Sequence, residues 1–186
     1  MSEEQSTTEE GRIEGADGPE IERALPADET LAALATEFAS ARFEVFEATG
    51  ASWDIVNVSA DEYHGLVAAA QAAGYTLFID LCAVDYLRRA PRFDVVVHIE
   101  SITPPRRLRI KIGVPASDAS IASITDIFAG ANFFEREAYD LMGVDFTGHP
   151  DMTRILLPDE WEGHPLRKDE SVGSVPIQFK ASYKTT

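Results

Sequence analysis

The sequence predicts a two-layer α+β domain with a mixed sheet of about five strands, followed by an extended C-terminal arm. Three observations support this prediction. Segments with helical and period-two patterns follow one another in the order α-β-β-α-β-β-β-α. Glycines and prolines lie between these segments, where turns are expected. Beyond residue 145 the regular patterns stop, although large apolar side chains continue.

The two ends of the chain differ in composition from its middle. Residues 1–24 carry eight acidic and two basic side chains, with Ile13 and Ile21 as the only large aliphatic residues. Because so little apolar surface cannot offset the entropy lost on ordering, we predict an acidic disordered tail there. The α+β domain is predicted over residues 25–145, and an extended partner-binding arm over residues 146–186.

The domain is predicted to begin with a helix and a hairpin. Residues 28–40 have apolar side chains at helical spacing, and Asp28 stands at the N-cap position. Two short strands are predicted over residues 42–48 and 52–59. Gly50 lies between them, which favours a hairpin.

A second helix is predicted over residues 59–75. Ser59 and Glu62 have the spacing of a capping box, and Gly74 stands where a helix-ending glycine is expected.

Three further strands are predicted in the middle of the chain. Residues 76–87 are apolar on both faces apart from their Asp residues, which indicates a central strand. Residues 92–100 and 107–114 alternate cleanly, and pairing them as a hairpin brings polar residues opposite each other: Glu100 near Arg107, and His98 near Arg109. Since opposite charges across strands attract, we interpret the basic row as a solvated sheet face: Arg107, Arg109 and Lys111.

The last predicted helix is also the most highly charged. Residues 116–143 are predicted to form a short helix and then a longer one, which Asn132 and Glu135 cap and Gly143 ends. The longer helix has an apolar face: Phe134, Ala138, Leu141 and Met142.

Charged residues of the same helix are expected to bind basic groups. Arg136 and Asp140 have ion-pair spacing. Glu135 and Glu137 are predicted at the two rims of the apolar face. We expect these acids and Asp140 to meet guanidinium groups of another segment or chain, such as Arg154 or Arg167 of the arm.

The arm combines helix-breaking residues with large apolar side chains. Its prolines and glycines rule out a long helix: Pro150, Pro158, Pro165 and Pro176, with Gly148, Gly163 and Gly173. Its apolar residues are not those of a disordered linker: Ile155, Leu156, Leu157, Trp161, Leu166, Ile177 and Phe179. A structureless loop of this length is uncommon inside a compact domain. We therefore predict that the arm packs against a neighbouring subunit.

Composition excludes several classes of function. The chain has 32 acidic and 16 basic residues, a net charge of −16, so we predict no nucleic-acid partner. No apolar run reaches the roughly 18–20 residues of a membrane span, and we predict no direct membrane insertion. The acidic N-terminus lacks the hydrophobic stretch of a secretory signal, which favours the cytoplasm. A single cysteine, Cys82, excludes a disulfide framework and is predicted to be buried and inert.

Residues 131–170 read ANFFEREAYDLMGVDFTGHPDMTRILLPDEWEGHPLRKDE. This segment resembles the signature of the 30 kDa subunit family of respiratory complex I, whose bacterial form is the C subunit of the proton-pumping NADH:quinone oxidoreductase. Weaker similarity in LCAVDY and RFDVVVHI extends the match over most of residues 75–170. The chain departs from the family pattern at Phe133, Met142 and Thr153, so no specific contact is carried over to those positions.

The resemblance implies a subunit of the peripheral arm of complex I that binds no cofactor itself. FMN and the iron–sulfur clusters would belong to partner subunits. The expected partners are the D subunit, which helps form the quinone site, with the B and I subunits nearby. These subunits would hold the chain at the cytoplasmic side of the cell membrane. We expect the motif residues to carry structural and partner contacts: Glu135, Arg136, Glu137, Asp140, His149, Pro150, Arg154, Trp161, His164, Leu166, Arg167 and Lys168.

Other functions stay open from the sequence alone. The equivalent subunit occurs in membrane-bound hydrogenases, F420H2 dehydrogenases and ferredoxin-linked complexes. An enzyme using Glu135 and Glu137 is disfavoured, because residues two apart on a helix point about 200° away from each other. A metal site at His149 and His164 is disfavoured because no third ligand stands at metal-like spacing.

Overall fold

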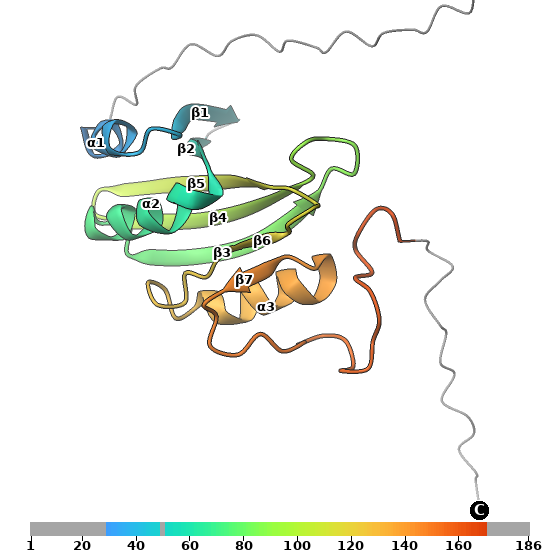
Figure 1. The fold of residues 1–186 in the computed structure, drawn as a ribbon. Helices are drawn as coiled ribbons and strands as arrows, with labels where there is room; N and C mark the ends of the chain where they lie inside the picture. The colour runs from blue at the N-terminus through green and yellow to red at the C-terminus, as the bar shows by residue number, and fades with distance from the viewer. Residues whose placement is uncertain (1–28, 49–50, 171–186) are drawn as a thin grey trace, which may run out of the picture.

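The structure, a computed structural model, describes residues 29–48 and 51–170 (Figure 1). The predicted tail at residues 1–24, the Asp28 cap and Gly50 lie outside the described residues. The helices are α1 (Glu29–Glu37), α2 (Ala60–Ala72) and α3 (Ala131–Met142). The strands are β1 (Arg42–Ala48), β2 (Ala51–Val58), β3 (Leu77–Asp85), β4 (Phe93–Ile102), β5 (Pro105–Val114), β6 (Ser120–Ala122) and β7 (Asp145–Thr147).

The first five strands form one sheet in the order β1-β2-β5-β4-β3. β2 and β5 run parallel, whereas the other neighbouring strands are antiparallel. The predicted mixed α+β fold is therefore confirmed. The predicted β4–β5 hairpin is also confirmed, with Glu100 opposite Arg107 and His98 opposite Arg109.

One face of this sheet carries the hydrophobic core. Alternate residues of the central strands are buried there: Phe93, Val95, Val97 and Ile99 of β4, and Leu108, Ile110, Ile112 and Val114 of β5. They share one cluster with buried side chains of all three helices, such as Leu34, Leu66 and Ala138. Burial of each large apolar side chain contributes about 1.5–3 kcal/mol, so this face holds the two layers together.

β3 lies at the edge of the sheet, and its predicted central position is wrong. Its apolar residues are explained by α3, which packs along it. Phe78 of β3 contacts the rings of Phe128 and Phe134. Cys82 points to the other face and is exposed, so the prediction that it is buried is also wrong. The sequence pattern suggested a neighbouring strand on each side of β3. In the described structure β3 has one neighbouring strand, and α3 takes the place of the other.

The short helix predicted before α3 is not formed. Residues 120–122 form β6, which pairs in parallel with β7. Ile121 stands opposite Phe146 in this ladder, and both side chains are buried. Pairing between segments distant in the sequence has overridden the local pattern here.

Tertiary contacts also replace two predicted caps. Ser59 is the N-cap of α2, but its side chain makes no cap hydrogen bond. The Glu62 carboxylate instead accepts hydrogen bonds from the Ser40 N–H and hydroxyl, at 2.9 and 2.5 Å. α3 has Gly130 as its N-cap, not Asn132 with Glu135. The predicted stops are confirmed, because Gly74 and Gly143 follow α2 and α3 with positive φ.

Candidate functional site

α3 is buried on two opposite sides. Ala131, Glu135 and Ala138 face the core, whereas Asp140 faces away from them, toward the arm. Figure 1 shows α3 below the sheet, with the arm running along its far side. The helix therefore connects the domain core to the arm.

Asp140 binds the arm through both carboxylate oxygens. Oδ1 accepts a hydrogen bond from Arg154 Nη1 at 2.6 Å. Oδ2 accepts three from consecutive backbone N–H groups, those of Ile155, Leu156 and Leu157, at 2.8–3.1 Å. Burial alone would raise the pKa of Asp140, but the hydrogen bonds from Leu157 and Arg154 outweigh it and lower that pKa. The group is thus a buried carboxylate that sets the path of four arm residues.

The structure confirms Arg154 as the partner of Asp140, whereas the predicted pair of Arg136 with Asp140 is wrong. Arg136 donates to the Thr153 carbonyl and hydroxyl and to the Arg154 carbonyl. His149 holds the start of the arm, because its Nε2 donates to the Asn132 carbonyl at 3.2 Å.

Arg167 caps the C-terminal end of α3 and pairs with no acid of this helix. Its Nε donates to the Met142 carbonyl at 2.6 Å and its Nη2 to the Gly143 carbonyl at 3.1 Å. His164 Nδ1 donates to the Asp140 carbonyl, and its ring lies against Tyr139. A Cβ at Gly143 would collide with Arg167 and His164, so a glycine is required for close packing as well as for its φ of 70°.

The described end of the arm is tied to the sheet. Asp85, at the end of β3, is buried and accepts two hydrogen bonds from Arg92, at 2.7 and 2.8 Å. It also accepts from the N–H groups of Leu87 and Lys168. Arg92 forms a second ion pair with Asp169 at 2.7 Å. This network joins the β3–β4 loop to the arm, and its members had no recognisable spacing in the sequence.

Replacing Arg92 by methionine is expected to lower the free energy of unfolding by about 2 kcal/mol, because it leaves Asp85 buried without its cation. Hydrogen bonds from Arg92 hold the pKa of Asp85 well below 3.8. The stability from this group is therefore present above pH 3.8 and is lost as the pH falls. Urea unfolding at pH 7 and at a pH below 3.8 measures both effects.

Arg88→Met is the matched control, because Arg88 is an exposed residue of the same loop. If Arg92→Met and Arg88→Met unfold alike, the network does not hold the arm. In Arg92→Met the loss of stability in acid should be smaller than in the parent chain, because Arg92 no longer lowers the pKa of Asp85.

The two glutamates of α3 do not meet guanidinium groups in the described structure. The expectation is wrong for the buried Glu135, whereas a contact of the exposed Glu137 with another chain stays a prediction. Glu135 is fully buried and lies within the apolar face. It accepts hydrogen bonds from the Ser123 hydroxyl at 2.7 Å and the Ile124 N–H at 2.8 Å. Burial raises the pKa of Glu135 more than these bonds lower it. Glu137 is exposed and forms no ion pair within the described ranges.

The remaining predicted residues also lie on the arm. Pro150, Leu166 and the Lys168 side chain are exposed, and Trp161 is half-buried. The structure thus gathers most predicted residues around α3, but as contacts within the chain. The sequence analysis missed Ser123, Asp85 and Arg92 because their partners lie on other elements.

Backbone N–H groups and arginine side chains of the arm bind α3 or its carboxylate, whereas several large apolar side chains of the arm are exposed. Leu156 is 61% exposed, Leu166 53% and Ile155 36%, although backbone groups of all three residues bind α3 or its carboxylate. Phe133 on α3 is also 61% exposed. On the surface of a soluble protein, large apolar side chains usually point inward. Exposed apolar groups held on a fixed backbone are typical of a protein–protein contact.

Comparison with known proteins agrees with this interpretation. The model of a family described as the 30 Kd subunit of respiratory-chain NADH dehydrogenase matches residues 56–175. The chain belongs to this family. The match includes α3 and the described part of the arm, and it confirms the resemblance seen in residues 131–170.

Two relatives of this 30 kDa family member are both named as the C subunit of NADH-quinone oxidoreductase. The relative from Roseiflexus castenholzii is 48% identical over 105 residues, which cover 56% of this chain and 60% of the relative. The relative from Geobacter sulfurreducens is 54% identical over 96 residues, covering 51% and 59%. The chain therefore spans about 60% of the length of these relatives.

Two solved structures share the fold of this family member. A trypsin-resistant fragment of Nqo5 is similar with a TM-score of 0.54 and 31% identity, covering 59% of this chain and 89% of the fragment. A chain of the membrane-bound sulfane sulfur reductase, an archaeal respiratory membrane complex, has a TM-score of 0.67. Its 20% identity, over 82% of this chain and 93% of that chain, shows a common fold alone.

Two features of other protein classes are missing from the part of this family member that the structure describes. Residues 29–48 and 51–170 contain no group of His, Cys, Asp or Glu side chains suited to a metal ion. No helix in those ranges is long and apolar enough to span a bilayer.

Proposed function

We propose that this chain is the C subunit of a proton-translocating NADH:quinone oxidoreductase and acts there as a structural subunit without a cofactor. The complex transfers electrons from NADH through FMN and iron–sulfur clusters to a quinone, and these groups would be held by partner subunits. The observation that carries the proposal is the arm, whose backbone and Arg154 are bound to α3 while Ile155, Leu156 and Leu166 are exposed.

The arm is already shaped for binding before a partner arrives. The Asp140 carboxylate accepts a hydrogen bond from the Leu156 N–H, and Arg167 donates one to the Met142 carbonyl of α3. The stretch that contains Leu156 and Leu166 is thus held at both ends. A preordered segment loses less conformational entropy on association, so more of the gain from apolar burial remains as binding energy. Covering each of these leucines would contribute about 1.5–3 kcal/mol.

The partners in this proposal are the D subunit, which helps form the quinone site, and the nearby B and I subunits. They would place the chain in the peripheral arm of the complex, at the cytoplasmic side of the cell membrane. The names of the relatives and the family match support a place in this complex. So does the outward apolar side of the arm, which needs a protein surface to cover it.

Leu156→Asp is expected to lower the amount of assembled complex severalfold, with normal turnover in each complex that still forms. The reason is that a charge would enter an apolar contact. Arg167→Ala and Glu137→Ala should act in the same direction, the first by releasing the arm from α3. The amount is measured by quantifying co-purified subunits from solubilised membranes, and turnover as NADH:quinone activity per bound FMN.

Val45→Asp is the matched control, because Val45 is 57% exposed but lies on β1, at the edge of the sheet opposite to β3 and the arm. Normal assembly with abolished turnover in Leu156→Asp would contradict a structural role. Co-purification with a hydrogenase, an F420H2 dehydrogenase or a ferredoxin-linked module would instead identify the equivalent subunit of one of those complexes.

A further inference from the structure

The sheet face opposite the core is not covered by any described element. All three helices contribute to the cluster on the core face. On the other face, strand register sets one residue of each strand in a continuous row across the sheet: Glu44, Ile55, Arg109, His98 and Asp80. The face is therefore a broad surface on the far side from the helices.

Hydrogen bonds join three residues of this row. The His98 ring binds Asp80 through Nδ1 at 2.5 Å, and Arg109 Nε donates to His98 Nε2 at 2.6 Å. Because Nε2 accepts from Arg109, the proton of a neutral imidazole lies on Nδ1, toward Asp80. Arg109 itself has no carboxylate partner in the described part of the chain, so its charge is available to another molecule.

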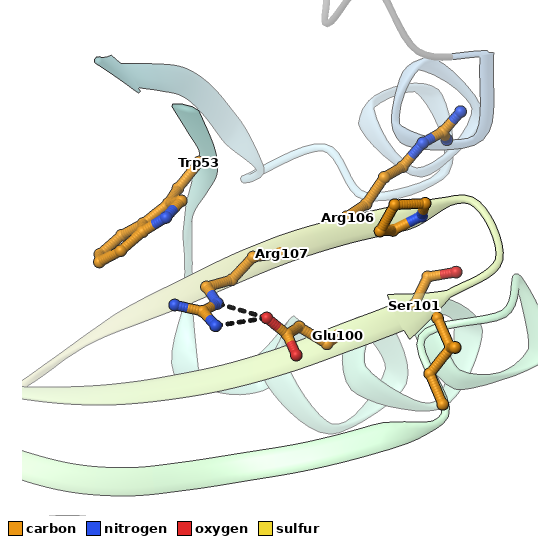
Figure 2. Close-up of a pocket in the computed structure, with 7 residues that line it drawn as sticks. Trp53, Glu100, Ser101, Arg106 and Arg107 are labelled. Atoms are coloured by element: carbon orange, nitrogen blue, oxygen red, sulfur yellow. Dashed lines mark hydrogen bonds and ion pairs between the residues drawn. The ribbon is translucent and has the colours of Figure 1, made fainter. Parts of the chain in front are cut away.

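Trp53 lies in the middle of these charges. The guanidinium carbons of Arg109 and Arg107 are 4.7 and 5.2 Å from the centre of its ring. The rings of Phe46 and His98 lie at 5.9 and 6.2 Å. Figure 2 shows Trp53 and Arg107 beside the same hollow, with Arg107 bound to Glu100.

The composition of this face differs from that of an ordinary solvated sheet. Ile55 and Val96 are buried on it, although no helix lies over them and they are not part of the core cluster. An aromatic and arginine centre with a charged rim is typical of protein interfaces, where Trp and Arg contribute most binding energy. The sequence predicted that Arg107, Arg109 and Lys111 lie on a solvated sheet face. The structure shows that Trp53 and two buried apolar residues lie on the same face.

The charges of the face indicate what it binds. The acids of the face are bound to neighbours on it: Glu100 to Arg107, Asp80 to His98 and Glu44 to Asn57. Arg109 and Lys111 have no carboxylate partner in the part of the chain that the structure describes. These cations lie on a chain with a net charge of −16. An acidic partner is therefore attracted to this face, whereas the remaining surface attracts a basic one.

We propose that this sheet face is a second interface, which binds a carboxylate-bearing segment of a neighbouring subunit. Acidic side chains of that segment meet Arg109 and Lys111, and an apolar group packs on Trp53. The inference rests on the proposed function, since it places the chain between subunits of a complex. The arm and this face lie on different sides of the domain. The chain therefore contacts two surfaces of neighbouring subunits at once.

The test is photo-crosslinking in the assembled complex. A photoreactive phenylalanine analogue replaces Asn57, which stands opposite Lys111 on this face, or Leu156 on the arm. The expected result is a crosslink from position 57 to an acidic peptide of another subunit. Crosslinks from position 156 alone would overturn the second interface and leave the proposed function intact. Crosslinks from neither position would contradict both.

A matched pair of variants tests the charge assignment. Lys111→Glu is expected to lower the crosslink yield from position 57 by about tenfold or more, because it sets like charges against each other. Lys111→Arg should retain the yield. Both variants should melt at the same temperature as the parent chain, since Lys111 has no partner to lose in the described structure. An unchanged yield in Lys111→Glu, or a crosslink to this chain's own residues, would overturn the proposal.

Discussion

Replacing Asp140 by alanine is expected to release the arm from α3 and to lower the free energy of unfolding by about 3–5 kcal/mol. The carboxylate is fully buried and accepts hydrogen bonds from Arg154 and three consecutive backbone N–H groups. Its removal leaves a half-buried guanidinium and three N–H groups without an acceptor. Urea unfolding measures the loss, and hydrogen exchange at residues 155–157 shows whether the arm is released.

Glu137→Ala is the matched control, because Glu137 lies on the same helix but is exposed. It should leave the unfolding free energy of the isolated chain unchanged. The pKa of Asp140 is lowered in the folded state, so its contribution is present above its ordinary pKa of 3.8 and is lost as the pH falls. Asp140→Ala should therefore remove part of the acid sensitivity. Unchanged exchange at residues 155–157 would show that other contacts hold the arm.

Replacing Glu135 by alanine is expected to lower the free energy of unfolding by about 3–4 kcal/mol. The change creates a cavity and leaves the Ser123 hydroxyl and the Ile124 N–H without their acceptor. Glu135→Gln should stay within about 1 kcal/mol of the parent chain at neutral pH. Its amide oxygen can accept from Ile124, and its NH2 can donate to Ser123 while that hydroxyl turns to Thr125, 2.8 Å away.

The two buried acids of α3 have opposite dependence on pH. Burial raises the pKa of Glu135, so the stability from this group is complete below its ordinary pKa of 4.5 and is lost as the pH rises. Glu135→Gln removes that loss, and its unfolding free energy should vary less between pH 4 and 7 than that of the parent. Thermal and urea unfolding across this range measure the difference. Equal destabilisation by alanine and glutamine would contradict this account.

These two acids give α3 its role in the proposed assembly. Glu135 fixes the helix to the segment between β6 and α3, and Asp140 fixes the arm to the opposite side of the helix. A partner that binds Leu156 and Leu166 is therefore connected to the domain core through one rigid element. Loss of either acid should weaken assembly as well as folding.

Local patterns were sufficient to predict most elements of the fold. Alternating residues such as Val95 and Val97 predicted β4, and the order of strands and helices predicted the mixed two-layer sheet. Glycines at positions 74 and 143 predicted the ends of two helices. These signals succeed because period and backbone preference depend on residues close together in the chain. The composition of the arm led us to predict that it packs against a neighbouring subunit, and that stays a prediction.

Only the tertiary structure decided where each charge and each strand lies. The sequence presents Glu135, Glu137 and Asp140 as three similar acids, yet one is buried in the core, one is exposed and one binds the arm. β3 appeared central, because its pattern does not show whether a strand or α3 covers its apolar side. The reason is physical: burial and pairing depend on segments far away along the chain, and charge alone does not identify the partner.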